Sequence, residues 1–246
     1  MSNRTQPRFM ASPKPARRVR PRMLWLAVLP ALLATVPLAG RGQAEPVALP
    51  LDRSVGWSDW GYRGRSRHEI SRASGGLQVK VARSAGGLAY RLPAPVVVGR
   101  VQATGRVRGA LAVDPARQGL DGQDDFVLRV GLVVRGEKRL GFFQRRLVPG
   151  WIRDLHDLAP PGAGLSHVHF FNVGAPGAVV GRERAHPLSD LLRETVTTTT
   201  LDDGTFDLVA TLAAPVETLG IWLSMDGDDT GSSFTLDVSS IVLAVR

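Results

Sequence analysis

The chain has 246 residues, no cysteine, a net charge of +9 and a sequence pI near 11.1. Residues 1–44 hold eight basic residues and no acidic one, which leaves 23 basic and 22 acidic residues, a net charge of +1, for residues 45–246. This near-neutral body lacks the positive footprint of a nucleic-acid-binding domain. The missing cysteines exclude disulfides, thiolate metal sites and a cysteine nucleophile.

The leader, residues 1–44, has the pattern of a bacterial secretory signal. An arginine-rich stretch precedes the uncharged residues 23–40, MLWLAVLPALLATVPLAG, and the small residues Gly42 and Ala44 follow. Cleavage after Ala44 would release a periplasmic or secreted protein. The alternative is an uncleaved inner-membrane anchor, because residues 23–40 reach the roughly 17 residues that span a bilayer. In either case we expect membrane contact only through this segment.

Beyond the leader, apolar residues alternate with others in four runs. Alternation with period two predicts strands that place one face in a core. After Val238 the apolar positions change parity, which predicts a β-bulge at Ser239 and Ser240. The four apolar faces are Leu77, Val79 and Val81; Phe126, Leu128, Val130, Leu132 and Val134; Leu219, Ile221, Leu223 and Met225; and Phe234, Leu236 and Val238.

Helical periodicity is confined to residues 139–146 and 151–158, while 27 glycines and 17 prolines punctuate the intervals between strands. About ten short strands joined by turns predict an all-β fold, a two-sheet β-sandwich or jelly roll. Neither a repeat nor a linker divides residues 45–246, so we expect a single domain there.

Three stretches together resemble a family of exported bacterial proteins, domain of unknown function 3047. They are SAGGLAYRL (84–92), GQDDFVLRVGLVV (122–134) and LGIWLSMDGDDTGSSFTLDVSSIVL (219–243). The chain departs from the family at Asp229, where asparagine is usual, and residues 142–200 match little of it. The resemblance implies a galactose-binding-like jelly roll and no established activity.

Two acidic loops are the main chemical lead. One holds Asp121, Asp124 and Asp125 before the strand that Phe126 opens, and the other holds Asp226, Asp228 and Asp229. Like charges this close need a cation or an arginine to neutralise them. In the second loop, alternating oxygen-bearing residues and a glycine, with Asp237 twelfth in the count, are the layout of a calcium loop.

Two other interpretations of these aspartates are open. Asp and Gly are also the residues of an ordinary tight turn. Arg129 can neutralise an aspartate of the neighbouring loop as a structural ion pair, or join Asp124 and Asp125 in binding a ligand. We expect Arg129 to lie on the strand face opposite Phe126.

Trp222 is out of phase with its apolar neighbours Ile221 and Leu223, so it belongs to the other face of its strand. An exposed tryptophan there can stack on a sugar ring. The alternative is a tryptophan covered by a loop or a second layer.

His167 and His169 are two residues apart, so on a strand they point to the same side. Such a pair supplies half of a metal site, which a carboxylate of the acidic loops would have to complete. The sequence has no Gly-x-Ser-x-Gly motif and no phosphate-binding loop, and we assign no catalytic residue.

These observations predict a non-catalytic binding module for a carbohydrate or another cell-envelope component. The alternatives are a metal-dependent hydrolase that uses His167, His169 and an acidic-loop aspartate, and a purely structural envelope protein. The first hypothesis depends on Trp222, the second on a bound metal, and the third on neither.

Overall fold

The computed structural model describes residues 45–73, 75–186 and 189–246. The leader and its cleavage site lie outside the described residues. From Glu45 onward these residues belong to one compact unit. Among the helices described, none has the length and apolarity needed to cross a bilayer.

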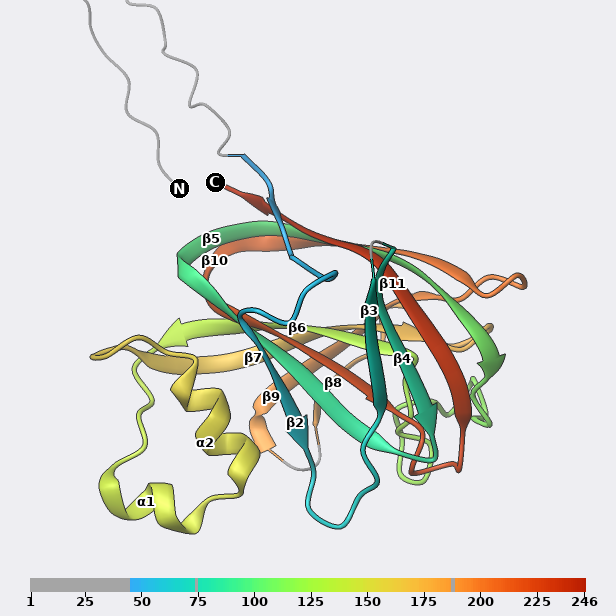
Figure 1. Cartoon of the computed structure of the whole chain (residues 1–246), viewed down its shortest axis with the longest axis horizontal. Helices are drawn as coiled ribbons and strands as arrows, with labels where there is room; N and C mark the ends of the chain where they lie inside the picture. The colour runs from blue at the N-terminus through green and yellow to red at the C-terminus, as the bar shows by residue number, and fades with distance from the viewer. Residues whose placement is uncertain (1–44, 74, 187–188) are drawn as a thin grey trace, which may run out of the picture. The chain divides into compact units, whose positions relative to one another are not determined.

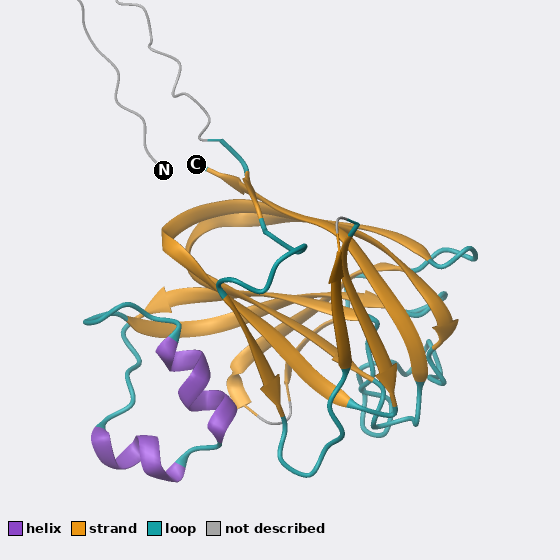
Figure 2. Cartoon of the chain, in the orientation of Figure 1, coloured by secondary structure: helices purple, strands orange, loops and turns teal. Residues whose placement is uncertain are grey.

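Strands make up most of the described residues, and the prediction of an all-β sandwich is confirmed (Figures 1 and 2). The elements are β1 (Val47–Ala48), β2 (Trp57–Gly61), β3 (Glu69–Ala73), β4 (Gly76–Ala82), β5 (Ala85–Ala110), β6 (Leu128–Gly136), α1 (Phe142–Leu147), α2 (Gly150–Asp157), β7 (Gly164–Gly174), β8 (Glu183–His186), β9 (Ser189–Thr199), β10 (Thr205–Asp226) and β11 (Ser233–Val245).

The strands form two layers that share the long strands β5 and β10. Layer A has the order β3, β4, β11, the second half of β5 and the first half of β10. Layer B has the order β2, the first half of β5, the second half of β10, β6, β7, β9 and β8. All neighbours pair antiparallel except β7 and β9, which run parallel.

Prolines lie where β5 and β10 pass from one layer to the other. Pro93 and Pro95 interrupt β5, and Pro215 interrupts β10 between Thr211 and Val216, where the pairing of the two strands shifts register. Proline cannot donate a ladder hydrogen bond. The two strands therefore bend together at this point, as Figure 1 shows.

The main core lies between the layers and follows the predicted alternation except at Leu219. It joins the apolar faces of β4 and β11 in layer A to those of β6 and β10 in layer B. Leu219 packs in a different cluster with Trp222, because the register of β10 shifts between Thr218 and Gly220. The register of β11 shifts between Val238 and Ser240, so the predicted bulge is confirmed.

The prediction that Phe126 opens a strand and faces the main core was wrong. Strand β6 begins only at Leu128, and Phe126 packs in a separate small cluster with Ala178 and Val196.

The connection between β6 and β7 carries both described helices, close to the predicted ranges (Figure 2). Leu155 and Leu158 at the end of this connection pack into a second apolar cluster on the outer face of layer B, the face turned away from layer A. The helical connection thus covers part of a face that would otherwise be open to solvent.

Candidate functional site

Two neighbouring rows of side chains on the outer face of layer B build the candidate site. Strand pairing places Trp222 opposite Gly131, Gly131 opposite Phe170, and Phe170 opposite Glu194. The next row joins Ser224, Arg129 and Asn172. Because alternate residues of a strand share a face, one aromatic row and one polar row run side by side across the layer.

Two glycines on this face make room for the aromatic row. A Cβ on Gly87 would lie 2.5 Å from Nε1 of Trp222, and a Cβ on Gly131 would lie 2.6 Å from the ring of Phe170. Trp222 also contacts the rings of Trp60 and Trp151, with centroid separations of 5.1 and 5.7 Å. Gly87 of β5 and Gly131 of β6 therefore allow the rings of Trp222 and Phe170 to pack directly against the backbone.

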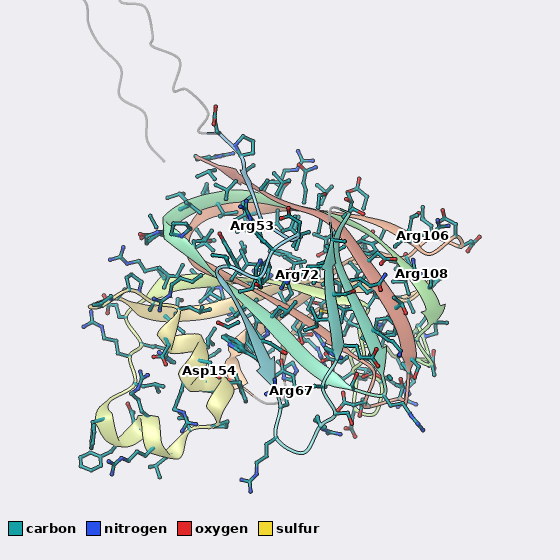
Figure 3. All side chains as sticks on the ribbon, viewed as in Figure 1. Arg53, Arg67, Arg72, Arg106, Arg108 and Asp154 are labelled. Atoms are coloured by element: carbon teal, nitrogen blue, oxygen red, sulfur yellow. The ribbon has the colours of Figure 1, made fainter. Side chains whose placement is uncertain are left out.

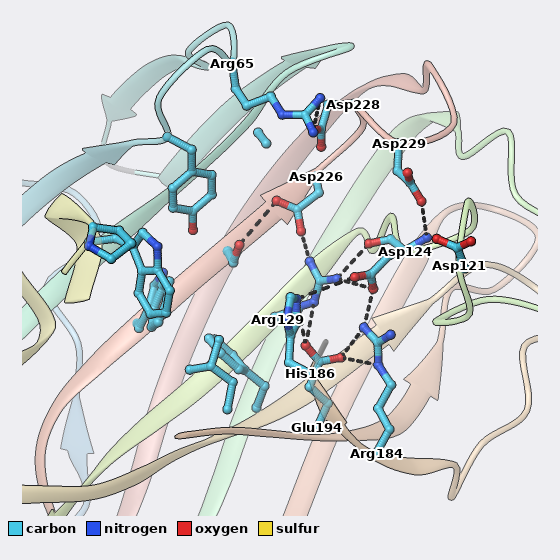
Figure 4. A pocket seen from close by; sticks show the side chains of 18 of the residues that line it. Arg65, Asp121, Asp124, Arg129, Arg184, His186, Glu194, Asp226, Asp228 and Asp229 are labelled. Carbon is cyan, nitrogen blue, oxygen red and sulfur yellow. Dashed lines mark hydrogen bonds and ion pairs between the residues drawn. The ribbon is translucent and has the colours of Figure 1, made fainter. Parts of the chain in front are cut away.

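A pocket of about 770 Å³ opens where the two rows meet the acidic loops (Figure 4). At one end its wall is aromatic, with Tyr62, Trp151, Phe170 and Trp222. Acidic and basic side chains form the other end, together with the imidazole of His186: Asp121, Asp124, Arg129, Arg184, Glu194, Asp226, Asp228 and Asp229. A pocket with one apolar wall and convergent polar groups is the usual form of a small-molecule site.

Arg129 is the centre of the charged end, and only 3% of its surface is exposed. Its Nη2 lies 2.9 Å from Oδ1 of Asp124, its Nε lies 3.5 Å from Oε1 of Glu194, and its Nη1 pairs with Asp226. Arg184 adds a second cation by pairing with Asp124 and, at 2.9 Å, with Oε2 of Glu194. Figure 4 shows Arg129 between Asp226 on one side and Glu194 on the other.

The pKa shifts in this network have opposed causes. Burial alone would raise the pKa of Glu194, but the charges of Arg129 and Arg184 hold it below its ordinary value. Burial would lower the pKa of Arg129, but Glu194 and Asp124 raise it. Burial dominates for His186 and lowers its pKa. The network therefore keeps Arg129 and Glu194 charged, while His186 is neutral at pH 7.

The ion-pair interpretation of Arg129 is confirmed, because it pairs with Asp124 of the neighbouring loop. The guanidinium also lies over the ring of Phe126, 4.6 Å from its centroid, on the outer side of layer B. Arg129 and Phe126 therefore do not occupy opposite faces as expected. The ring of Phe126 can contact Arg129 because Phe126 precedes β6, so the alternation of side chains along the strand does not fix its direction.

The two acidic loops bind each other. Asp125 is fully buried and accepts hydrogen bonds from the main-chain N–H groups of Asp229 and Thr230, at 3.2 and 2.8 Å. In return, Oδ2 of Asp229 accepts a hydrogen bond from the N–H of Asp124 at 2.8 Å. Asp125 thus fixes the wall of the pocket from behind, while Asp124 faces the pocket.

Three of the predicted calcium ligands, Asp226, Asp228 and Asp229, line the pocket, but they do not converge on one point, and Asp237 lies elsewhere. Asp226 pairs with Arg129, and Asp228 lies 3.0 Å from Nη1 of Arg65. Asp237 lies on the outer face of layer A, where Arg108 and Gln78 bind it (Figure 3 labels Arg108 on β5). Within residues 45–73, 75–186 and 189–246, no group of three or more acidic or histidine side chains is arranged to hold a metal ion. The calcium prediction depended on spacing along the sequence. Asp237 lies beyond the turn, on β11 of layer A, and so is separated from the other three aspartates.

Trp222 lies on the predicted face but is not the exposed platform that we expected. Only 3% of its surface is accessible, because Trp60, Trp151 and Phe170 pack around it. Its ligand-binding role stays a prediction, since Trp222 still lines the pocket. Trp151 of α2 is half-buried and lines the same pocket, so it presents more ring surface than Trp222.

His167 and His169 share a face of β7, and their ring centroids are 6.3 Å apart. That face is the one turned toward layer A, since His169 stacks on Phe171 of the main core. The pocket lies on the other face, where Phe170 points. The sheet itself separates the histidines from the aspartates at the pocket, so the expected metal-dependent hydrolase site is not assembled.

Sequence reasoning missed Arg184, His186 and Glu194. They come from β8 and β9, in the part of the chain that lacks clear motifs. One signal was present: Leu192 and Glu194 are in phase, so a charged residue interrupts an otherwise apolar strand face. A charge at a buried strand position needs a partner, but the partner's identity was not readable.

Neither the protein-family models nor the curated proteins give a match to the chain. Among solved structures, the xylan-binding module CBM15 matches with a TM-score of 0.38 and 10% identity, over 83% of this chain and 98% of that one. A family 11 carbohydrate-binding module from Clostridium thermocellum, in complex with a β-1,3-1,4-mixed-linked tetrasaccharide, matches with a TM-score of 0.37 and 8% identity, over 82% and 96%.

Proposed function

We propose that the protein is a non-catalytic carbohydrate-binding module whose ligand occupies the pocket on the outer face of layer B. One observation carries the proposal: a half-buried tryptophan, Trp151, and a fixed array of charged hydrogen-bonding groups line the same pocket. A sugar ring has an apolar face that stacks on an aromatic ring and a rim of hydroxyls that needs donors and acceptors.

The network around Arg129 supports this role because it is held before any ligand arrives. Arg129 and Glu194 are buried, and their partners come from four different segments of the chain. Groups that are already ordered lose little entropy on binding, which favours affinity. The polar side chains that line the pocket can therefore receive hydroxyls without rearrangement.

The sequence of the leader bears on where the protein would bind its ligand. We propose that the protein is exported to the periplasm or beyond, as the secretory pattern of residues 1–44 suggests, and that its ligand is a saccharide of the cell envelope or its surroundings. Membership of the domain of unknown function 3047 family is part of the same proposal and rests on the three stretches that resemble it.

The test is calorimetric titration of the purified protein with a panel of oligosaccharides. Trp151→Ala should weaken binding about tenfold or more, since an aromatic contact contributes about 1.5 kcal/mol beyond the area it buries. Phe143→Ala is the matched control, because Phe143 is 77% exposed on the neighbouring α1 and does not line the pocket. Unchanged affinity in Trp151→Ala, or no saccharide bound by the unaltered protein, would contradict the proposal.

A further inference from the structure

The charged end of the pocket contains more negative than positive charge. Its innermost groups are two guanidiniums, Arg129 and Arg184, and three carboxylates, Asp124, Glu194 and Asp226. His186 also belongs to the network, with its Nε2 3.5 Å from Oδ2 of Asp124 and 3.8 Å from Oε1 of Glu194, and burial lowers its pKa, so it adds no charge at pH 7. The centre of the network therefore has a net charge of −1.

The rim of the pocket adds to this excess. Asp121, Asp228 and Asp229 line the pocket against Arg63 and Arg65, so the whole lining holds six carboxylates and four guanidiniums. Arg65 pairs with Asp228, but more than half of its side chain is in solvent, where the interaction is screened. Burial raises the pKa of Asp228, and the nearby charges of Asp125 and Asp229 add to this rise, despite Arg65.

Two buried polar atoms at this end have no hydrogen-bond partner among the described residues. They are Oε1 of Glu194 and Nε of Arg129, which belong to residues that line the pocket and are more than nine-tenths buried. A buried acceptor without a donor costs about 1–3 kcal/mol, more when it is charged. Oε1 of Glu194 and Nε of Arg129 lie 3.5 Å from each other without forming a hydrogen bond, so Glu194 can accept one from a ligand.

We propose that the pocket selects an amino sugar, a saccharide that carries a free ammonium group, over neutral and acidic sugars. This inference rests on the proposed function. An ammonium group brings three donors and one positive charge, which offset the excess of carboxylates and supply a donor to Glu194, although not an acceptor to Nε of Arg129. A uronic acid would bring a further negative charge beside Glu194 and Asp226, which like-charge repulsion disfavours. The aromatic wall also attracts a cation through its ring faces.

The test compares sugars that differ only at one group. The unaltered protein is titrated at pH 7 with oligomers of glucose and glucosamine, of galactose and galactosamine, and of mannose and mannosamine, and with an oligogalacturonate. A partly buried charge pair predicts about tenfold or more tighter binding for the amine in any pair that binds. That preference should shrink as salt is raised from low to high concentration.

The variants separate charge from folding. Asp121→Asn at the rim should reduce the preference without touching the buried network, and Asp226→Asn should abolish the preference, measured as the ratio of the two affinities within each pair. Asp237→Asn, on the outer face of layer A, is the matched control and should leave this ratio unchanged. Equal or tighter binding of the hydroxyl sugar by the unaltered protein overturns this inference and leaves the proposed function standing. If no sugar of any pair binds, both are overturned.

Discussion

The carboxylate of Asp125 accepts hydrogen bonds from both the main-chain N–H and the hydroxyl group of Thr230, 105 residues further along the chain. This contact joins the loop before β6 to the loop between β10 and β11, and both loops supply pocket residues. The position of Asp124 and Asp228 around the pocket therefore depends on a residue that does not line it.

Asp125→Ala should lower the free energy of unfolding by about 2–4 kcal/mol, because it removes an acceptor that three donors share at a fully buried position. Urea unfolding followed by circular dichroism measures the change. Asp121→Ala is the matched control in the same loop, where the side chain is exposed, and it should be neutral. Equal stability of the two variants would show that the loops are not held by Asp125.

Calcium should leave the melting temperature unchanged. A calcium site at a hundredfold excess over its dissociation constant adds about 2.7 kcal/mol, which is several degrees for a protein of this size. Asp226 and Asp228 are instead paired with Arg129 and Arg65, and Asp237 lies on layer A. Thermal unfolding in EDTA and in millimolar calcium checks this. A rise that Asp228→Ala removes would restore the calcium interpretation.

Trp222→Ala should destabilise the fold, not only weaken ligand binding. The ring is buried among Trp60, Trp151 and Phe170, and removal of such a ring costs about 3–5 kcal/mol. Trp151→Ala should cost clearly less, because Trp151 is half-buried. Chemical denaturation of the two variants in parallel gives the comparison. Full stability of Trp222→Ala would mean that the aromatic cluster is not packed as described.

Acidification should destabilise the protein between about pH 6.5 and pH 4. Burial lowers the pKa of all five histidines, and that of His167, which also feels Arg193, falls to about 4 from 6.5. In this window the unfolded chain binds more protons than the folded one, so stability is complete above pH 6.5 and falls as the pH falls.

His167→Gln should make this pH dependence shallower. The imidazole of His167 is about half-exposed, and solvent screening reduces the free energy expected from its pKa shift by roughly half. We therefore expect His167 to account for about 1 kcal/mol of the stability lost between pH 7 and pH 5. Urea unfolding at the two pH values measures the slope for each protein. The same slope in both would assign the pH dependence to the other histidines.

Features that depend on short stretches of sequence were predictable. The alternation of Leu77, Val79 and Val81 specifies a strand because side-chain direction along a strand is a local property. The change of parity after Val238 located the bulge for the same reason. Alternation also placed Trp222 and Arg129 on the non-core faces of their own strands, and the pairing of β6 with β10 makes these one face.

The residues that pair with Arg129 and cover Trp222 on that face were decided by tertiary structure. Glu194 reaches Arg129 only because β9 pairs parallel to β7, and a parallel connection leaves no mark in the periodicity of either strand. The exposure of Trp222 depended on whether another segment covered it, and α2 does so from between β6 and β7. The sequence alone thus determined the strands and the direction of their side chains, because these follow from neighbours in the chain. The tertiary structure decided the partners of the charges and the covering of the aromatic face, because those depend on which distant segments meet.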